Sequence, residues 1–380
     1  MSLLWRRRRD LHPDQIKAIE GLLVTGRYLL LGPPGSGKTS ILLHRGQYLR
    51  LAPHNLANVR LLTFSRTLRE FIAVSGDDRF PPTLIQTVRD FVDQLFRTYG
   101  VARPTFDEKV DLPEQNRIRA LEALRLVEQD LRVQYDALLV DEVQDLCPEE
   151  VELVSKLSER LMISGDSRQR LFEPVGGIDA AREHGCTDTV LRHHFRISPQ
   201  ICRVADCILV QGNYRLAEYC HYQGPAPTEP VALGNLSREE QIAKLFQALD
   251  VQFDTYNTPG DLIGVVAWRK DDCDFISAKL RLSERFSRAT RVFHSAVPGR
   301  RFDSDCRICV VTAQGCKGIE FRALHWLFAD EPSYMTRERA YTVVTRAKTS
   351  LTVYHEGPLH GSLAGAFPPP GRGLFEEDDR

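Results

Sequence analysis

The stretch Leu29–Thr39 reads LLLGPPGSGKT, and it decides the fold of the first half of the chain. Its three leucines form a short apolar run of the kind found in buried strands. Gly32–Thr39 fits the pattern GxxxxGK[ST], and Ser40–Leu49, which follows directly, has helical periodicity. Strand, glycine-rich loop and helix in this order are typical of a phosphate-binding loop, so the sequence predicts a nucleotide-binding α/β domain.

The residue types of this loop indicate what each position contributes. Glycines let backbone N–H groups converge on phosphates, Lys38 can reach the β- and γ-phosphates, and the Thr39 hydroxyl can bind Mg²⁺. A chance match in a loop that binds no nucleotide is the alternative, and the strand and helix on either side disfavour it. We expect the following residues to surround the nucleotide: Gly32, Pro33, Pro34, Gly35, Ser36, Gly37, Lys38, Thr39 and Ser40.

A second stretch, Asp141–Asp145, reads DEVQD and follows the apolar run Ala137–Val140. If that run is a parallel strand, Asp141 and Glu142 stand at its carboxyl end, where ligands bind in α/β sheets. Asp141 is then the candidate to hold the metal, and Glu142 is the candidate general base for water. The alternative is that the two acids merely precede a helix, since Asp145–Glu150 has a helix-start pattern.

Short apolar runs alternate with helical segments along the whole chain, which predicts two α/β domains with parallel sheets flanked by helices. A Pro/Gly-containing hinge near residues 173–177 divides the chain into residues 1–176 and 177–362. We expect residues 363–380 to form a disordered tail. The predicted strands are Tyr28–Leu31, Val59–Thr63, Ala137–Val140, Leu161–Ser164, Leu262–Trp268, Ile308–Thr312, Leu324–Phe328 and Leu351–Tyr354.

Composition excludes several classes of protein. The 380 residues are 42% hydrophobic with a formal net charge of −1, so any nucleic-acid binding must come from local sites. The nine cysteines are scattered and odd in number, which indicates reduced thiols. No signal-peptide core or membrane-spanning run is found, and we expect a cytoplasmic protein without a membrane partner.

Together with these two stretches, further motifs resemble, in order, those of the UvrD/Rep class of superfamily 1 helicases. Leu11–Ile19 resembles the Q motif and Leu62–Arg66 the TFTN segment. Later stretches resemble motifs III to VI: Gly165–Gln169 (GDSRQ), His194–Arg196 (HFR), Gln314–Phe321 (QGCKGIEF) and Tyr341–Lys348 (YTVVTRAK). The resemblance implies two RecA-like domains with an ATP site in the cleft between them, dependent on ATP and Mg²⁺.

The resemblance also implies roles for single residues. Gln15 would read adenine, Phe195 would stack on it, and Gln169 would sense the γ-phosphate. Arg196 and Arg346 would be arginine fingers. Glu320 would contact the ribose, and Gly318 would belong to the same nucleotide-binding motif. Nucleic acid would meet Phe64 and Arg66, with Arg89 and Phe172 as further candidates; core packing is the alternative for both phenylalanines.

Three departures from the family pattern keep more than one function open. Little room exists for the large inserted subdomains, Pro174 replaces a common stacking tryptophan, and Thr87–Phe91 replaces TFHSF. The leading hypothesis is a helicase or translocase that moves 3′ to 5′ on single-stranded DNA, with RNA as an alternative substrate and DNA repair as one compatible pathway. The second is an ATPase switch that controls a partner such as a nuclease. The third is a P-loop ATPase or kinase without a nucleic-acid role.

Overall fold

The computed structural model describes residues 7–64, 68–70, 72, 80–107, 109–166, 176–209, 214–294, 303, 305–330 and 335–367. These residues form two compact units that divide after Phe195, later than the boundary at residue 176 that the sequence predicts. The difference arises because strand β6 (Thr187–Val190) pairs with β1 (Arg27–Leu31). Helix α7 (Gly177–Glu183) also buries Ile178 in the core of unit 1, so both elements belong to that unit.

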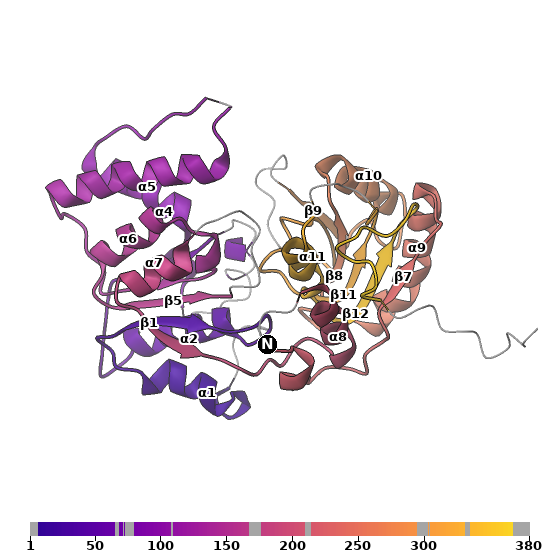
Figure 1. Cartoon of the computed structure of the whole chain (residues 1–380), viewed down its shortest axis with the longest axis horizontal. Helices are drawn as coiled ribbons and strands as arrows, with labels where there is room; N and C mark the ends of the chain where they lie inside the picture. Colours follow the sequence, from indigo (N-terminus) through magenta and orange to yellow (C-terminus); the bar gives the residue numbers. More distant parts are fainter. Residues whose placement is uncertain are drawn as a thin grey trace, which may run out of the picture. The chain divides into compact units, whose positions relative to one another are not determined.

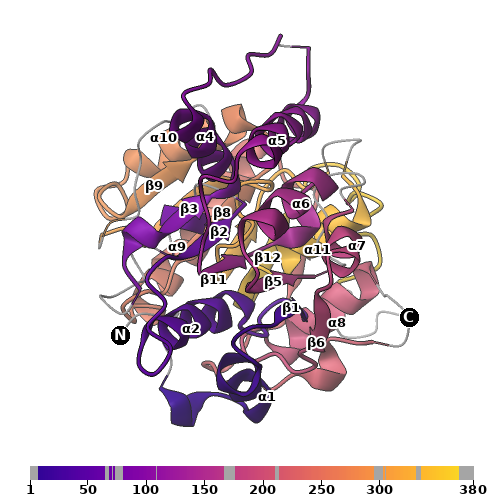
Figure 2. The same ribbon diagram turned by 90° about the vertical axis from the view of Figure 1, so that its left-hand side faces the viewer.

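Unit 1 contains a six-stranded sheet in the order β3-β2-β4-β5-β1-β6. All of its strand pairs are parallel. Figure 2 shows β2 and β3 toward one edge and β1 and β6 toward the other. The remaining strands are β2 (Val59–Thr63), β3 (Ile85–Thr87), β4 (Ala137–Val140) and β5 (Leu161–Gly165).

Helices cover both faces of this sheet, α4 to α7 on one side and α1 and α2 on the other (Figure 1). Every residue of β4 is buried, as expected of a central parallel strand covered on both faces. Helices α4 to α7 share one apolar core with the strands of this sheet. The helices are α1 (Pro13–Ile16), α2 (Lys38–Arg50), α4 (Val88–Tyr99), α5 (Leu112–Gln129), α6 (Pro148–Leu157) and α7.

Unit 2 repeats this plan with a second six-stranded parallel sheet, in the order β7-β12-β11-β8-β10-β9. Helices α9 and α10 share an apolar core with the strands. Two such sheets flanked by helices are the architecture predicted for two RecA-like α/β domains. The elements are α8 (Pro199–Ile208), β7 (Val231–Leu233), α9 (Arg238–Thr255), β8 (Ile263–Ala267), α10 (Lys270–Arg281), β9 (Thr290–Phe293), β10 (Ile308–Thr312), β11 (Phe321–Trp326), α11 (Arg337–Val344) and β12 (Ala347–Tyr354).

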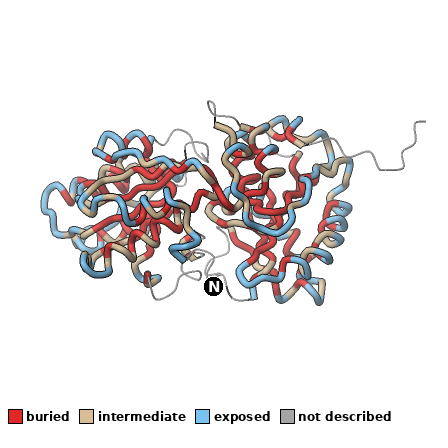
Figure 3. The backbone as a smooth tube through the Cα atoms, turned by 90° about the horizontal axis from the view of Figure 1, so that it is seen from below, coloured by how far each residue is buried: buried red, intermediate tan, exposed pale blue. Residues whose placement is uncertain are grey.

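All eight strands predicted from the sequence are present, with ends that differ by a few residues at most. In Figure 3 the buried chain lies mainly in the interior of each unit and the exposed chain mainly along its outer parts. Leu363 and Ala366 are also buried, so the predicted tail does not begin at residue 363; residues 368–380 lie outside the described part. Among the described residues, no helix combines the length and apolar character needed to cross a membrane.

Candidate nucleotide site

The glycine-rich loop connects β1 to α2 and folds around the amine of Lys38. Gly35 and Gly37 adopt φ values of +76° and +90°, a region that glycine enters without steric cost. Helix α2 begins at Lys38, whose Nζ donates to the carbonyl oxygens of Gly32 at 2.8 Å and Pro33 at 3.2 Å. The loop thus places a cation beside a helix N-terminus, an arrangement suited to phosphate.

Ser36 and Gln15 complete the inner surface of this loop. The Ser36 hydroxyl is fully buried and has no hydrogen-bond partner among the described residues, so an anion would satisfy it. The Gln15 amide donates to the Ser36 carbonyl at 2.8 Å and accepts from the His12 N–H at 3.0 Å. Phe195 donates its backbone N–H to Gly35 at 3.2 Å, and its ring lies 5.7 Å from that of His12. Gln15 and Phe195 therefore both contact the loop, while their predicted reading of adenine stays a prediction.

Asp141 lies at the carboxyl end of β4 and faces the first turn of α2. Its carboxylate accepts hydrogen bonds from the hydroxyls of Thr39 and Ser164, both at 2.6 Å. Complete burial raises the pKa of the Asp141 carboxyl, and the neighbouring Glu142 charge raises it further. Thr39 and Asp141 offer the oxygen ligands that Mg²⁺ prefers, and a divalent cation would offset the clustered negative charge. The two residues predicted to bind metal thus fit the ion.

Glu142 follows with φ of +58°, a left-handed conformation that costs free energy in a residue other than glycine. Its carboxylate is nearly buried and accepts a hydrogen bond from the Gln144 side-chain amide. The Gln144 amide oxygen in turn accepts from the backbone N–H of Asp166, at 3.0 Å, just beyond the end of β5. A Cβ atom on Gly165 would lie 2.8 Å from that oxygen, so glycine leaves room for the bridge.

Sequence reasoning assigned no role to Gln144. Its place inside DEVQD is a signal, but the contact with Asp166 depends on the adjacency of β4 and β5, which the pentapeptide alone does not contain. With Gln144 included, unit 1 gathers the glycine-rich loop, the two predicted metal ligands and a positioned carboxylate at the carboxyl ends of β1, β4 and β5.

In unit 2 the structure brings together several of the other predicted nucleotide residues. The guanidinium of Arg196 pairs with the carboxylate of Glu320, close to Gly318 with its φ of +81°. The backbone carbonyl of Arg346 accepts from the N–H of Phe321 at 2.9 Å, and its Nε donates to the Thr342 carbonyl at 3.2 Å. Arg196, Glu320 and Arg346 thus meet at the amino ends of β11 and β12. Their predicted approach to Glu142 in unit 1 stays a prediction.

The predicted nucleic-acid contacts are described only in part. Phe64 is half-buried and packs against the core of unit 1, the alternative that its sequence left open. Arg89 is exposed in the first turn of α4, which Thr87 caps. The predicted contacts Arg66 and Phe172, and the predicted γ-phosphate sensor Gln169, lie outside the described residues.

Comparison with known proteins agrees with the character of unit 1. Residues 15–174 match the family model described as an AAA domain, so this region is a P-loop nucleotide-binding domain. No curated protein matches the chain.

Solved helicase structures are similar to the chain only at low sequence identity. The C-terminal domain of a possible DNA helicase from Lactobacillus plantarum WCFS1 is 21% identical over 45% of this chain and 92% of its own, with a TM-score of 0.33. PRRSV helicase is 13% identical over 90% of this chain (TM-score 0.44), and arterivirus nonstructural protein 10, a helicase, is 15% identical over 92% (TM-score 0.41). The matches span 54% and 64% of those two viral chains. The function has to be argued from this chain's own residues.

Proposed function

We propose that the chain is an ATP- and Mg²⁺-dependent superfamily 1 motor of the UvrD/Rep type that acts on single-stranded nucleic acid, most readily DNA. One observation carries the proposal. Around a phosphate-binding loop, Thr39 contacts Asp141, and Glu142 stands next to Asp141 with its carboxylate fixed by Gln144. This arrangement of residues is suited to activating a water molecule beside bound nucleotide, and binding nucleotide alone would not require it.

The residues of unit 1 have separate tasks in this proposal. Thr39 and Asp141 would hold Mg²⁺, which supplies positive charge next to the phosphates when bound. Lys38 and the Ser36 hydroxyl bind phosphate oxygens, and Glu142 orients the attacking water and accepts its proton. Gln144 holds the Glu142 carboxylate in place by donating a hydrogen bond to it.

Unit 2 would provide the cations that compensate charge in the transition state. Arg196 and Arg346 are the proposed fingers, a contribution that in other NTPases is about 10³–10⁵ in rate. Glu320, which pairs with Arg196 here, would exchange that contact for the ribose when nucleotide binds. Movement in the 3′-to-5′ direction and a cytoplasmic setting are further parts of the proposal, which rest on the family resemblance.

Support for a nucleic-acid partner comes from arginines on α4, α5 and the segment between them. Arg119 is buried, and two of its guanidinium nitrogens, Nε and Nη1, lack hydrogen-bond partners among the described residues. Burial lowers the pKa of Arg119, and the charges of Arg89 and Arg103 lower it further. Among the described residues, Asp93 is the acid that pairs with Arg119 and Arg103, at 4.0 and 3.2 Å. This excess of positive charge suits a phosphodiester backbone.

The decisive experiment measures ATP turnover with and without single-stranded DNA, single-stranded RNA and duplex DNA. We expect single-stranded DNA to stimulate turnover strongly and the Glu142→Gln variant to bind ATP yet hydrolyse almost none. Turnover close to wild type in Glu142→Gln would refute its assignment as the base. Turnover indifferent to every nucleic acid would favour a P-loop ATPase or kinase of another kind.

The second candidate is an ATPase switch that controls a partner such as a nuclease and does not unwind. Pro174, at the place of a common stacking tryptophan, and the short intervals between motifs favour it. A strand-displacement assay with the isolated chain separates the two candidates. ATP-dependent displacement supports the motor, whereas stimulated turnover without displacement supports the switch.

A further inference from the structure

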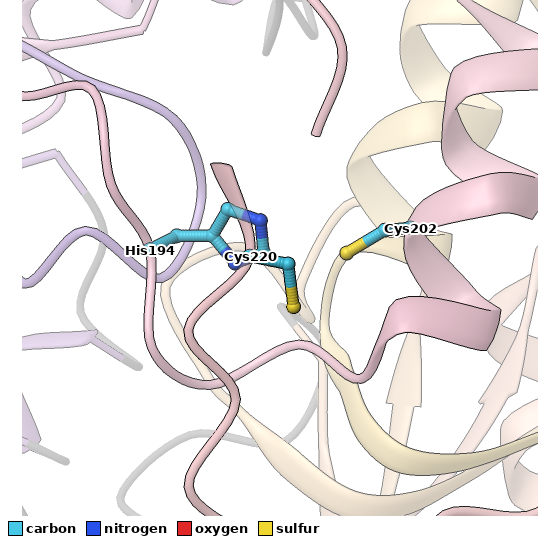
Figure 4. Close-up of side chains that lie close together, drawn as sticks. All are labelled: His194, Cys202 and Cys220. Carbon is cyan, nitrogen blue, oxygen red and sulfur yellow. The ribbon is translucent and has the colours of Figure 1, made fainter. Parts of the chain in front are cut away.

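Two cysteines of unit 2 lie against each other at one side of α8. Cys202 is on the helix, Cys220 follows a short turn, and the sulfur of Cys202 points toward Cys220 (Figure 4). Both sulfurs lie near the carbonyl oxygen of Ile197, at 3.7 Å for Cys202 and 3.2 Å for Cys220, so this oxygen can accept from either thiol. Their Sγ atoms lie within 4.8 Å of each other, so a disulfide bond of about 2 Å requires a modest approach of the side chains.

The backbone that carries Cys220 is fastened to the same helix. The carboxylate of Asp206 accepts the N–H groups of Leu216 and Ala217, at 2.8 and 3.0 Å. Cys202 and Asp206 are four residues apart and therefore share one face of α8. Asp206 thus fixes the segment Leu216–Ala217, which leads to Cys220, against α8. Cys202, one helical turn before Asp206, faces Cys220, so the two sulfurs stay close together.

The two thiols differ in burial and in pKa, as a peroxide-reactive cysteine and the resolving cysteine that later attacks it do. Cys220 is half-buried, whereas Cys202 is fully buried. Hydrogen bonding from Cys202 lowers the pKa of the Cys220 thiol to about 7, although burial opposes this effect. Cys220 therefore has a large thiolate fraction near neutral pH, and a sulfenic acid formed there would have a thiol beside it.

We propose that Cys202 and Cys220 are a peroxide-reactive pair that closes to an intramolecular disulfide. The Cys220 thiolate attacks one oxygen of hydrogen peroxide, so that an S–O bond forms, the O–O bond breaks and hydroxide leaves. Cys202 then attacks the Cys220 sulfur, the S–S bond forms, and the S–O oxygen leaves as water with the Cys202 proton. Two thiols are oxidised and one peroxide is reduced to two waters.

The disulfide would change the chain next to a predicted arginine finger. Ile197 directly follows Arg196, and its carbonyl would have no thiol donor once the two sulfurs are oxidised. Formation of the disulfide does not depend on ATP hydrolysis, so it can be measured whether or not the chain is an ATP-dependent motor.

The test treats the reduced full-length protein with a small excess of hydrogen peroxide, alkylates the remaining thiols and maps peptides by mass spectrometry. We expect a Cys202–Cys220 linked peptide that dithiothreitol removes. Its rate of formation should rise with pH and level off above about pH 7. In Cys202→Ser, a sulfenic acid should accumulate at Cys220 and react with dimedone.

The matched control is Cys207→Ser, because Cys207 is an exposed cysteine of the same helix. This variant should form the disulfide at the wild-type rate, whereas Asp206→Ala should form it several-fold more slowly because the Cys220 segment is released. Absence of the linked peptide from oxidised wild-type protein overturns the proposal, and this outcome does not depend on how any variant folds. Oxidation of Cys207 ahead of Cys220 overturns it as well.

Discussion

Gln144 connects the carboxylate that we propose as the general base to the sheet. Its amide donates to the Glu142 carboxylate and accepts from the N–H of Asp166, so it joins the ends of β4 and β5. Replacing Gln144 with alanine removes the donor that orients the proposed base and leaves the phosphate loop intact. We expect kcat to fall about 10–100-fold, as for other supporting residues of active sites, with KM for ATP nearly unchanged.

Steady-state kinetics combined with thermal unfolding distinguishes positioning from simple loss of stability. Without the donor, the Glu142 carboxylate loses its fixed orientation, so kcat of Gln144→Ala should be low across the pH profile while Tm stays close to that of the wild type. Gln129→Ala, at the exposed end of α5, is the control and should leave the profile in place. An equal fall in activity at every pH, accompanied by a lower Tm, would mean that Gln144 only stabilises the fold.

At the scale of elements, the start of α6 makes the stability of the protein depend on pH. Glu150 is buried in its first turn and accepts the N–H of Cys147 at 3.0 Å. Burial raises the pKa of Glu150 to about 7, from an ordinary value of 4.5. The folded state therefore holds this proton more tightly than the unfolded state. The resulting stability is complete below about pH 4.5 and is lost as pH rises through about 7, a change of about 3 kcal/mol.

Calorimetry of Glu150→Gln checks this sign. Glutamine keeps an uncharged acceptor for the Cys147 N–H. The difference in Tm, variant minus wild type, should therefore increase as the pH is raised from 5 to 8. Glu159→Gln, an exposed acid just after the same helix, should show no such trend. A Tm difference between wild type and Glu150→Gln that does not vary with pH would contradict the assignment.

The arginines on α4, α5 and the intervening segment predict how nucleic-acid binding depends on salt. Each cation that meets a phosphate of a single strand contributes about 0.7 to the slope of log affinity against log salt concentration. Arg89→Ala and Arg103→Ala should each lower that slope by about this amount, measured by fluorescence anisotropy with labelled single-stranded DNA. Arg125→Ala, an exposed arginine of α5 paired with Glu122, is the control. Unchanged slopes in the first two variants would place the strand elsewhere.

The sequence predicts an element or a site residue where the signal lies within a few neighbouring residues, and it fails where the contact comes from tertiary packing. Continuous apolar runs, such as Ala137–Val140, identify central strands because burial on both faces demands them. The sequence does not identify four short strands, β3, β6, β7 and β9: β3 and β7 have three residues each, and β6 is largely exposed. The loop residues and Asp141 follow from motif and context, whereas Gln144 and Arg119 depend on neighbours brought by tertiary packing.

At the scale of the whole molecule, the proposed reaction needs residues from both units. Unit 1 provides the phosphate loop, the proposed metal ligands Thr39 and Asp141, and Glu142, which in this proposal bind the nucleotide. Arg346 belongs to unit 2, where its backbone is tied to the start of β11. If it stabilises transition-state charge, Arg346→Ala should retain ATP binding, and its kcat should fall by about 10³-fold or more.

Measuring both quantities on the full-length chain tests this division of labour. A fluorescent ATP analogue gives Kd, and phosphate release in the presence of single-stranded DNA gives kcat. Arg337→Ala, an exposed arginine of α11 in the same unit, should match the wild type in both. A Kd that weakens as much as kcat falls would mean that Arg346 helps to bind ground-state ATP. Unchanged kcat would mean that hydrolysis needs only unit 1, and the two-domain mechanism would then be wrong.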